Sequence, residues 1–461
     1  MRARLAVALI LLSSAATAGG ISVTDAWRAA MRHDPLFAAA QAQRDAGRAR
    51  GSEATALWLP TLTATGSAGR SDLESRTQGA YFSAPGFPST NGVDFQTSVN
   101  GGTATRWALV AEQPLFDAAR LADSTVQRNA ARMAEAQYRA AEQDLMLRSA
   151  KAYFAVLNAR AQLQTLVHLR AAAEHTRGEN QARYETGDIP VTDMREAQAS
   201  ADAIDVQELD ARSAVALSEA AFADLTGLDA ANLGDLPEAA TMDLPVPEPL
   251  ESWTQRALSG SPQLLIQRLA VTTANAQLSR YGALNSPRLS LVGQVGRDSL
   301  HGNGDFGSTD ITARQASIGL QASIPLFTGG LRSAERHEAR ALEHQAEAEL
   351  AGADQQVRQQ ARAAWLSVTT AAARVEALRR LRASTASRRD ATRLGAEIGG
   401  RTALELLSAE ADHQRAEADF ERAQGDWFLA GLQLRAVAGE LSEDDLRQID
   451  RRMESAPAAA K

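Results

Sequence analysis

The sequence presents one series of landmark residues twice, and this duplication constrains the fold more than any local motif. The first set recurs 226 or 227 positions later: Trp27 with Trp253, Pro35 with Pro262, Pro60 with Pro287, and Gly69-Arg70 with Gly296-Arg297. The second set recurs after 211 or 212 positions: Pro114-Leu115-Phe116 with Pro325-Leu326-Phe327, Tyr153 with Trp365, Gly187 with Gly399, and Gly227 with Gly439. This order predicts two copies of one structural unit, at 19–250 and 251–461.

The spacing changes by 16 residues in one place, between the Gly-Arg and the Pro-Leu-Phe landmarks. Both copies are rich there in Gly, Ser, Thr, Asn and Asp, and surface loops tolerate insertions. We therefore expect a loop at 71–102 in the first copy and a shorter one at about 298–312 in the second.

Segments of alternating polarity lie on both sides of the expected loops. Between Gln315 and Ile324 every second residue is apolar, which is typical of a strand with one apolar and one polar face. We expect strand pairs at 60–115 and 287–326. Each segment has about 10 residues, the length of a tilted membrane-spanning strand. A soluble β-hairpin in each copy remains the alternative.

Long helices are expected after each strand pair. No proline occurs at 117–186 or 329–398, and Ala, Gln, Arg and Glu dominate both stretches. Apolar residues in the first stretch follow coiled-coil spacing, and about 70 residues of helix would extend roughly 105 Å. Shorter helices are expected at about 22–57, 191–227 and 402–439. Each copy would then form a helical hairpin whose tip is the turn at Gly187 or Gly399.

Four strands cannot form a membrane barrel alone. An open sheet in lipid would leave unpaired edges, and the smallest membrane barrels have about eight strands. Closure therefore requires several copies of the chain, and the strand count by itself does not give the number.

The first 18 residues indicate export. Arg2 and Arg4 precede an apolar run, and the small residues Ala16-Thr17-Ala18 form a cleavage pattern, so we interpret 1–18 as a signal peptide. The sequence has no cysteine, which excludes a lipid-modified N-terminal cysteine and disulfides. A formal net charge of −8 with only two lysines argues against a nucleic-acid partner.

Motifs for chemistry are incomplete or misplaced. Gly302, Gly304 and Gly307 match a dinucleotide fingerprint, but the motif lies between two strands with no helix after it. His337 and Glu338 begin a zinc motif in which Ala341 replaces the second histidine. We therefore expect no enzymatic activity, no cofactor and no bound metal.

The two tips combine helix-ending and helix-starting residues. Gly187 and Gly399 suit helix C-termini, Pro190 suits a restart, and Asp193 and Glu405 suit helix N-termini. Helix capping alone would explain these residues.

With these features in order, the chain resembles the TolC family of outer-membrane channel-tunnel proteins over essentially its whole mature length. The resemblance rests on the duplication, on Gln113-Pro114-Leu115-Phe116-Asp117 and Ile324 to Gly330 at the strand ends, and on the two tips. It implies a mainly α fold with a transmembrane β-barrel part. Three protomers would each give four strands to one twelve-stranded barrel with extracellular loops, and their helices would form a periplasmic α-barrel. A belt part-way along would include 228–250 and the tail from about 440.

The resemblance also implies roles for tip residues. A periplasmic adaptor would dock on the turns that four residues form: Gly187, Asp188, Gly399 and Gly400. Asp193 and Arg401 match a pair that holds the tunnel closed, and Glu405 matches an acidic ring at the entrance. Ser408 and Ala396 depart from the family pattern, where an acidic residue and a tyrosine are expected.

The function expected from this resemblance is a trimeric outer-membrane exit channel for proteins or small molecules. Its partners would be a periplasmic adaptor, an inner-membrane pump (ABC or proton-driven) and outer-membrane lipid. The absent lipidation cysteine favours type I secretion over drug efflux. The alternative is a periplasmic coiled-coil scaffold or adaptor protein, which would fractionate as a soluble protein.

Overall fold

The computed structural model describes residues 20–233, 248–281, 287–304 and 307–454. The predicted signal peptide at 1–18 and most of the predicted linker at 228–250 lie outside these ranges. The chain divides into two compact units. The strand unit comprises Ala46–Met133 and Arg268–Ala348, and the helical unit comprises Met1–Asp45, Ala134–Gln267 and Glu349–Lys461.

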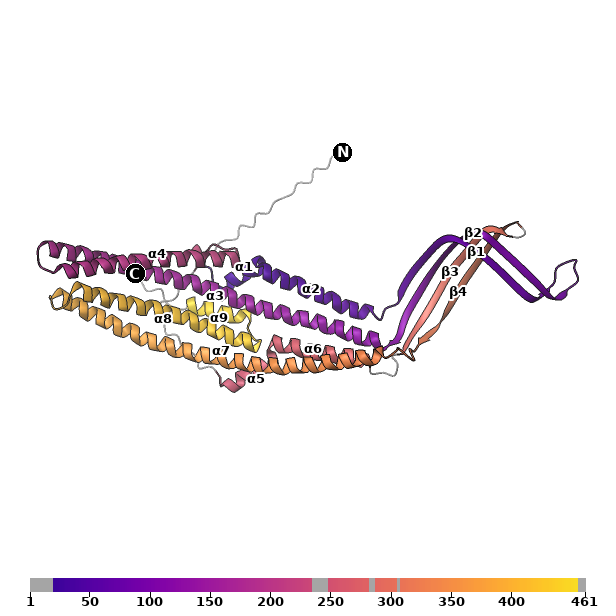
Figure 1. Ribbon diagram of the computed structural model, residues 1–461. Helices are drawn as coiled ribbons and strands as arrows, with labels where there is room; N and C mark the ends of the chain where they lie inside the picture. The colour runs from indigo at the N-terminus through magenta and orange to yellow at the C-terminus, as the bar shows by residue number, and fades with distance from the viewer. Residues whose placement is uncertain (1–19, 234–247, 282–286, 305–306, 455–461) are drawn as a thin grey trace, which may run out of the picture. The chain divides into compact units, whose positions relative to one another are not determined.

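The fold class is confirmed, because the described chain is mainly helical with one antiparallel four-stranded sheet (Figure 1). The elements of the first repeat are α1 (Val23–His33), α2 (Pro35–Ala56), β1 (Thr61–Phe82), β2 (Thr90–Asp117), α3 (Ala118–Glu185), α4 (Val191–Thr226) and the short 3-10 helix η1 (Ala230–Asn232). Those of the second are α5 (Leu250–Gly260), α6 (Pro262–Ser279), β3 (Arg288–Gly304), β4 (Gly307–Ser323), α7 (Leu331–Glu397), α8 (Ala403–Ala438) and α9 (Glu443–Glu454).

The single helix expected at about 22–57 was wrong, because the chain breaks at Asp34. A residue before proline is driven out of the helical region, and Asp34 precedes Pro35 with an extended backbone (φ −69°, ψ 117°). The Asp34 carboxylate then accepts hydrogen bonds from the N–H groups of Leu36 (3.4 Å) and Phe37 (3.3 Å). The break therefore starts a new, side-chain-capped helix.

The second repeat breaks at the equivalent place. Ser261 precedes Pro262 and is also extended (φ −58°, ψ 122°). The end of α5 approaches the end of α8 so closely that a Cβ atom on Gly260 would lie 2.3 Å from the carbonyl oxygen of Ala438. Gly439 ends α8 at a positive φ of 74°. Glycine is therefore required on both sides of this contact.

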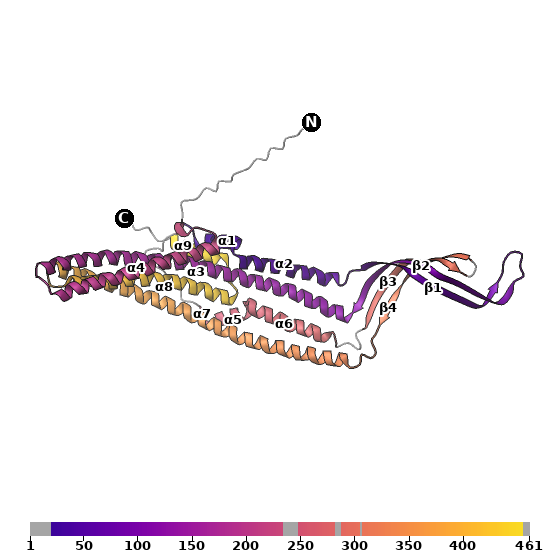
Figure 2. The same cartoon turned by 45° about the horizontal axis from the view of Figure 1, so that its top comes forward.

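In the helical unit, α4, α3, α8 and α7 lie side by side in that order (Figures 1 and 2). Its largest core cluster joins α1, α3, α4, α8 and α9. Phe154 of α3 stacks on Phe428 of α8 with ring centroids 5.8 Å apart, and Tyr153 meets Phe222 of α4 edge-on at 6.5 Å. The first contact fixes the two helical hairpins against each other, and the second holds α3 and α4 together within the first hairpin.

The tail from about 440, which the resemblance assigns to a belt, includes helix α9. Its Asp450 carboxylate accepts hydrogen bonds from the backbone N–H groups of Val23 (2.9 Å) and Thr24 (3.1 Å) at the start of α1. A carboxylate at this position satisfies N–H groups that have no partner within their own helix. The two ends of the described chain are therefore held together.

The strand unit contains one sheet in the order β1-β2-β3-β4, with every neighbouring pair antiparallel. The expected loop at 71–102 was wrong, because β1 continues to Phe82 and β2 begins at Thr90. Backbone pairing extends through this polar segment, with register shifts near Ser71 and Thr77. The 16 extra residues of the first repeat therefore lengthen a hairpin.

The other strand limits also differ from the expectation. Most of the shorter loop expected at 298–312 is strand, since β3 runs to Gly304 and β4 begins at Gly307. Pro114 does not end its strand either. The pairing of β2 with β3 continues after a register shift between Pro114 and Phe116, and β2 ends at Asp117. An irregularity of this kind accommodates a proline within a ladder.

Candidate functional site

The sheet has one apolar and one polar face, and the strand register assigns each residue to a face. Because directly paired residues point to the same side, Leu62, Ala111, Gly293 and Ile318 form one row of a face that we call the apolar face. Its neighbouring rows are Ala64, Leu109, Val295 and Ala316 on one side and Gln113, Leu291 and Leu320 on the other.

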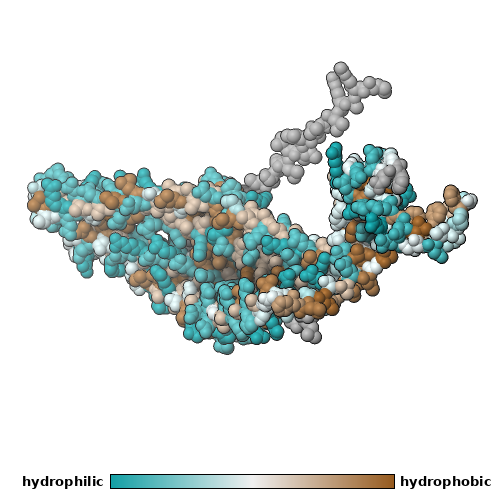
Figure 3. All heavy atoms as spheres, turned by 45° about the vertical axis from the view of Figure 1, so that its right-hand side comes forward, coloured by the Kyte–Doolittle hydropathy of each residue, from teal (hydrophilic) through white to brown (hydrophobic). Residues whose placement is uncertain are grey.

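The apolar face is exposed in this chain. Ile318 is 78% exposed and Leu62 72% exposed. Figure 3 shows hydrophobic side chains gathered over the part of the sheet next to the helices. Trp107 and Phe116, which are also exposed, lie nine residues apart on β2, a distance of about 30 Å along a strand. Such a band, bordered by aromatic side chains, has the height and composition of a membrane-facing strand surface.

Both edges of this sheet are open in the single chain. In the described residues β1 pairs only with β2, and β4 pairs only with β3. Free strand edges are ready to pair with another chain, and in lipid they must do so because no water satisfies their N–H and C=O groups. By contrast, no helix among the described residues is long and apolar enough to cross a membrane.

The first helical tip ends α3 with a left-handed glycine. Gly187 has a φ of 80°, and its N–H donates to the Tyr184 carbonyl at 3.0 Å. The N–H of Asp188 donates to the Arg183 carbonyl at 2.8 Å. This pair of bonds is a Schellman motif, which requires a residue that tolerates positive φ. The Asp188 carboxylate accepts a hydrogen bond from Thr186 at 2.8 Å.

The second tip repeats this geometry. Gly399 has a φ of 75°, its N–H donates to the Ala396 carbonyl at 3.0 Å, and that of Gly400 donates to the Gly395 carbonyl at 2.8 Å. Helix α8 then begins with a capping box, in which Thr402 and Glu405 each bond the backbone N–H of the other. Helix α4 begins after Pro190, which makes no side-chain cap hydrogen bond. The two tips are therefore built alike at the end of the long helix and differently at the start of the next helix.

Within this chain Arg401 forms an ion pair with Glu405, at 2.8 Å. The Thr402 backbone N–H and the Arg401 guanidinium hold the pKa of the Glu405 carboxyl below its ordinary value. Asp193, at the start of α4, accepts a hydrogen bond from the Thr192 hydroxyl at 3.2 Å. The pairing of Asp193 with Arg401 stays a prediction for the assembled protein, and so does an acidic ring formed by Glu405.

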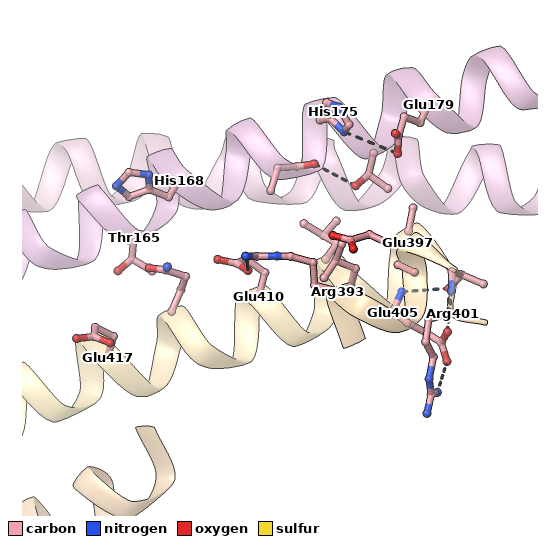
Figure 4. Close-up of a pocket in the computed structure, with 18 of the residues that line it drawn as sticks. Thr165, His168, His175, Glu179, Arg393, Glu397, Arg401, Glu405, Glu410 and Glu417 are labelled. Atoms are coloured by element: carbon pink, nitrogen blue, oxygen red, sulfur yellow. Dashed lines mark hydrogen bonds and ion pairs between the residues drawn. The ribbon is translucent and has the colours of Figure 1, made fainter. Parts of the chain in front are cut away.

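A polar groove of about 1270 Å³ separates α3 from the second tip and α8 (Figure 4). Its lining includes several of the residues considered above, among them Ala396, Gly399, Gly400, Arg401 and Glu405. His168 and His175 line its α3 side, and Glu410 and Glu417 line its α8 side. These two histidines were not predicted as site residues. Their seven-residue spacing, shared by the two glutamates, was the signal that each pair occupies one helix face.

The sequence matches the model of the outer membrane efflux protein family over 27–228 and 253–440. The chain belongs to this family. The match skips the junction between the two repeats, so each repeat of an outer membrane efflux protein contributes one matched region. The localisation is accordingly the outer membrane, with an elongated helical part in the periplasm.

Similar proteins include secretion and efflux channels of this family. Proteases secretion protein PrtF of Dickeya chrysanthemi is 28% identical over 468 residues, covering 100% of this chain and 97% of the relative. Outer membrane protein TolC of Vibrio cholerae is 26% identical and covers 96% of each chain. These relatives support an outer-membrane exit channel as the general function.

Solved structures share the fold. The outer membrane protein VceC of Vibrio cholerae superposes with a TM-score of 0.69 at 19% identity, covering 90% of this chain and 96% of that one. The Campylobacter jejuni CmeC outer membrane channel gives a TM-score of 0.71 at 15% identity, covering 95% of this chain and 90% of that one.

Proposed function

We propose that three copies of this chain form one outer-membrane exit channel, a passive duct with no catalytic step. The observation that carries the proposal is the four-stranded sheet with an exposed apolar face and two open edges. Three such sheets, joined edge to edge, make a twelve-stranded barrel without free edges, which lipid requires.

The helical tips are the proposed site of recruitment and opening. A periplasmic adaptor would dock on the two turns at Gly187-Asp188 and Gly399-Gly400, whose backbones are fixed by Schellman motifs. Asp193, Arg401 and Glu405 would close the periplasmic entrance. Opening would separate the helical hairpins at this end, driven by the adaptor and an inner-membrane pump.

Type I secretion is the favoured pathway. The relative PrtF is named as a proteases secretion protein and covers the whole chain. The sequence also lacks the cysteine that a lipid anchor would require. The cargo would then be a protein, and the pump an ABC transporter.

The test is fractionation followed by conductance. Cells expressing the chain are separated into periplasmic and outer-membrane fractions. The molar mass of the detergent-extracted protein is measured by light scattering, and the protein is then added to planar bilayers. We expect an outer-membrane protein with the mass of three chains that produces discrete conductance steps. A soluble periplasmic protein would contradict the proposal and favour a coiled-coil scaffold. An outer-membrane trimer that does not conduct even when Asp193→Ala and Arg401→Ala are combined would contradict the duct.

A further inference from the structure

One row of the apolar face carries charge without a counter-charge. In register across the sheet, this row contains Gly66 of β1, Trp107 of β2, Arg297 of β3 and Arg314 of β4. It lies two rows from Leu62 and Ile318, on the side toward the β1–β2 and β3–β4 turns. The apolar band therefore ends at a row with one indole and two guanidinium groups.

Arg297 and Arg314 are directly paired across β3 and β4. Like charges at such positions repel each other. Both side chains are exposed, and among the described residues neither forms an ion pair or a side-chain hydrogen bond. Asp298 follows Arg297 in the sequence, but it points to the opposite face, where it pairs with Arg106 at 2.6 Å.

The rows on both sides of the two arginines lack carboxylates. The row toward the helices contains Ala64, Leu109, Val295 and Ala316, which are all apolar. The row toward the turns contains Ala68, Thr105, Ser299 and Thr312, which bring three hydroxyl groups. Along the strands, from the helices toward the turns, this face therefore presents first an apolar surface suited to acyl chains, then two cationic side chains, and then neutral hydrogen-bond donors.

This arrangement matches the parts of a phosphorylated lipid. Guanidinium groups bind phosphate oxygens through paired hydrogen bonds, and Trp side chains prefer the level of lipid headgroups. A phosphate between Arg297 and Arg314 would neutralise their repulsion and could accept further hydrogen bonds from the three hydroxyls. The acyl chains of the same lipid would extend over Leu109 and Val295.

We propose that Arg297 and Arg314 bind the phosphate of a phosphorylated glycolipid in the outer leaflet of the outer membrane. The inference rests on the proposed function in one respect, that the apolar face meets lipid. The row lies near the middle of β3 and β4, on the border of the apolar band that is away from the strand ends leading into α3 and α7, and this selects the outer leaflet. The bound lipid would fix the height of the barrel in the membrane.

The test measures retained lipid. Full-length protein is reconstituted into phosphatidylcholine vesicles containing lipid A, extracted in mild detergent, and analysed by native mass spectrometry for bound lipid A. The double variant Arg297→Gln and Arg314→Gln is compared with the double variant Arg106→Gln and Asp298→Asn, which removes a neutral charge pair from the opposite face in the adjacent row. We expect retention to fall about fivefold for each arginine removed, and to be unchanged in the control.

Two further arms identify the ligand. Dephosphorylated lipid A should be retained no better by the wild-type protein than by the arginine variant. Displacement of lipid A by millimolar inorganic phosphate would overturn the lipid assignment in favour of a free anion site. Equal retention by all three proteins would overturn the proposal altogether. The arginine variant is expected to conduct like the wild type. If the wild-type protein itself does not conduct, that result counts against the proposed channel function and not against the lipid site.

Discussion

Arg382 of α7 donates to both carboxylate oxygens of Glu417 of α8, with nitrogen–oxygen distances of 2.7 and 2.9 Å. The same pair occurs 212 positions earlier, where Arg170 of α3 contacts Asp205 of α4 at 2.7 Å. Each helical hairpin is therefore clamped by an equivalent ion pair. The duplication seen in the sequence thus extends to individual interactions.

We predict that Glu417→Gln loosens the second hairpin. Both side chains are only 26% exposed, and a partly buried bidentate pair contributes about 1–2 kcal/mol. Thermal unfolding followed by circular dichroism should therefore show a lower Tm. Glu338→Gln, an exposed change on α7, is the control and should leave the Tm unchanged. Equal Tm values for the two variants would contradict a clamping role.

Asp34 predicts a pH-dependent contribution to stability. Burial raises the pKa of the Asp34 carboxyl. This effect is outweighed by the hydrogen bond and charge interaction with Arg148, at 2.6 Å, and by the hydrogen bonds from the N–H groups of Leu36 and Phe37, all of which lower the pKa. The net pKa lies below the ordinary value. A lowered folded-state pKa gives stability that is complete above the unfolded pKa of about 3.9 and is lost as pH falls through the folded pKa.

The corresponding variant is Asp34→Asn, which keeps the shape of the helix cap but loses the charge. At pH 7 we expect it to be less stable by about 2 kcal/mol, since a hydrogen bond to a charged group is broken. The difference should shrink as pH falls below about 4 and toward the lowered folded-state pKa, where the wild-type carboxylate becomes protonated. Urea unfolding at several pH values measures this, and a difference that is constant with pH would exclude the charge as its cause.

The tip glycines should be required for adaptor docking. Valine is strained at the positive φ of Gly187 and Gly399, so Gly187→Val and Gly399→Val should distort the turns. We expect capture of the protein by its cognate adaptor to fall at least about tenfold. Gly86→Val introduces the same strain at φ 89°, but between β1 and β2, and should leave capture intact. Full capture by both tip variants would remove these turns from the docking surface.

The gate prediction can be separated from the ion pair that Arg401, in the second tip, forms with Glu405 of α8. If Asp193 and Arg401 hold the entrance closed, the double variant Asp193→Ala and Arg401→Ala should raise single-channel conductance. Glu405→Gln removes the partner that Arg401 has in this chain but leaves Arg401 free to meet Asp193. It should therefore conduct like the wild type. Unchanged conductance in the double variant would remove both residues from the gate.

The sequence predicted two of the positions at which backbone conformation depends on a single residue. Gly187 and Gly399 end helices at positive φ, as their place between polar, helix-forming segments indicated. The break before Pro35 was missed although this proline was one of the repeat landmarks. Its effect on Asp34 was predictable from local sterics, but the helical pattern on both sides concealed it.

Other features depend on contacts that side-chain patterns do not encode. Residues 71–82 and 90–102 are strand because β1 and β2 pair through their backbones, whereas their Ser, Thr, Asn and Gly content suggested a loop. The partner of Arg401 in this chain was also not predictable, because Glu405, four residues later, offers it a carboxylate as well. Spacing alone does not decide such a competition.

In the proposed barrel β1 of one copy pairs with β4 of the next, and disulfide cross-linking tests this pairing. The chain has no cysteine, so Ala64→Cys on β1 can be combined in turn with Ala316→Cys, Ile318→Cys or Leu320→Cys on β4. Three β4 positions are needed because barrel closure shifts the register between copies. Leu109→Cys with Val295→Cys, which are paired within one chain, is the control and should give monomers only.

After mild oxidation of outer membranes, non-reducing gels report the covalent species. We expect dimers and trimers, and nothing larger, for at least one β1–β4 combination, and we expect them to disappear on reduction. Monomers alone for all three combinations, with the control disulfide formed, would contradict closure of the barrel by three copies of this chain.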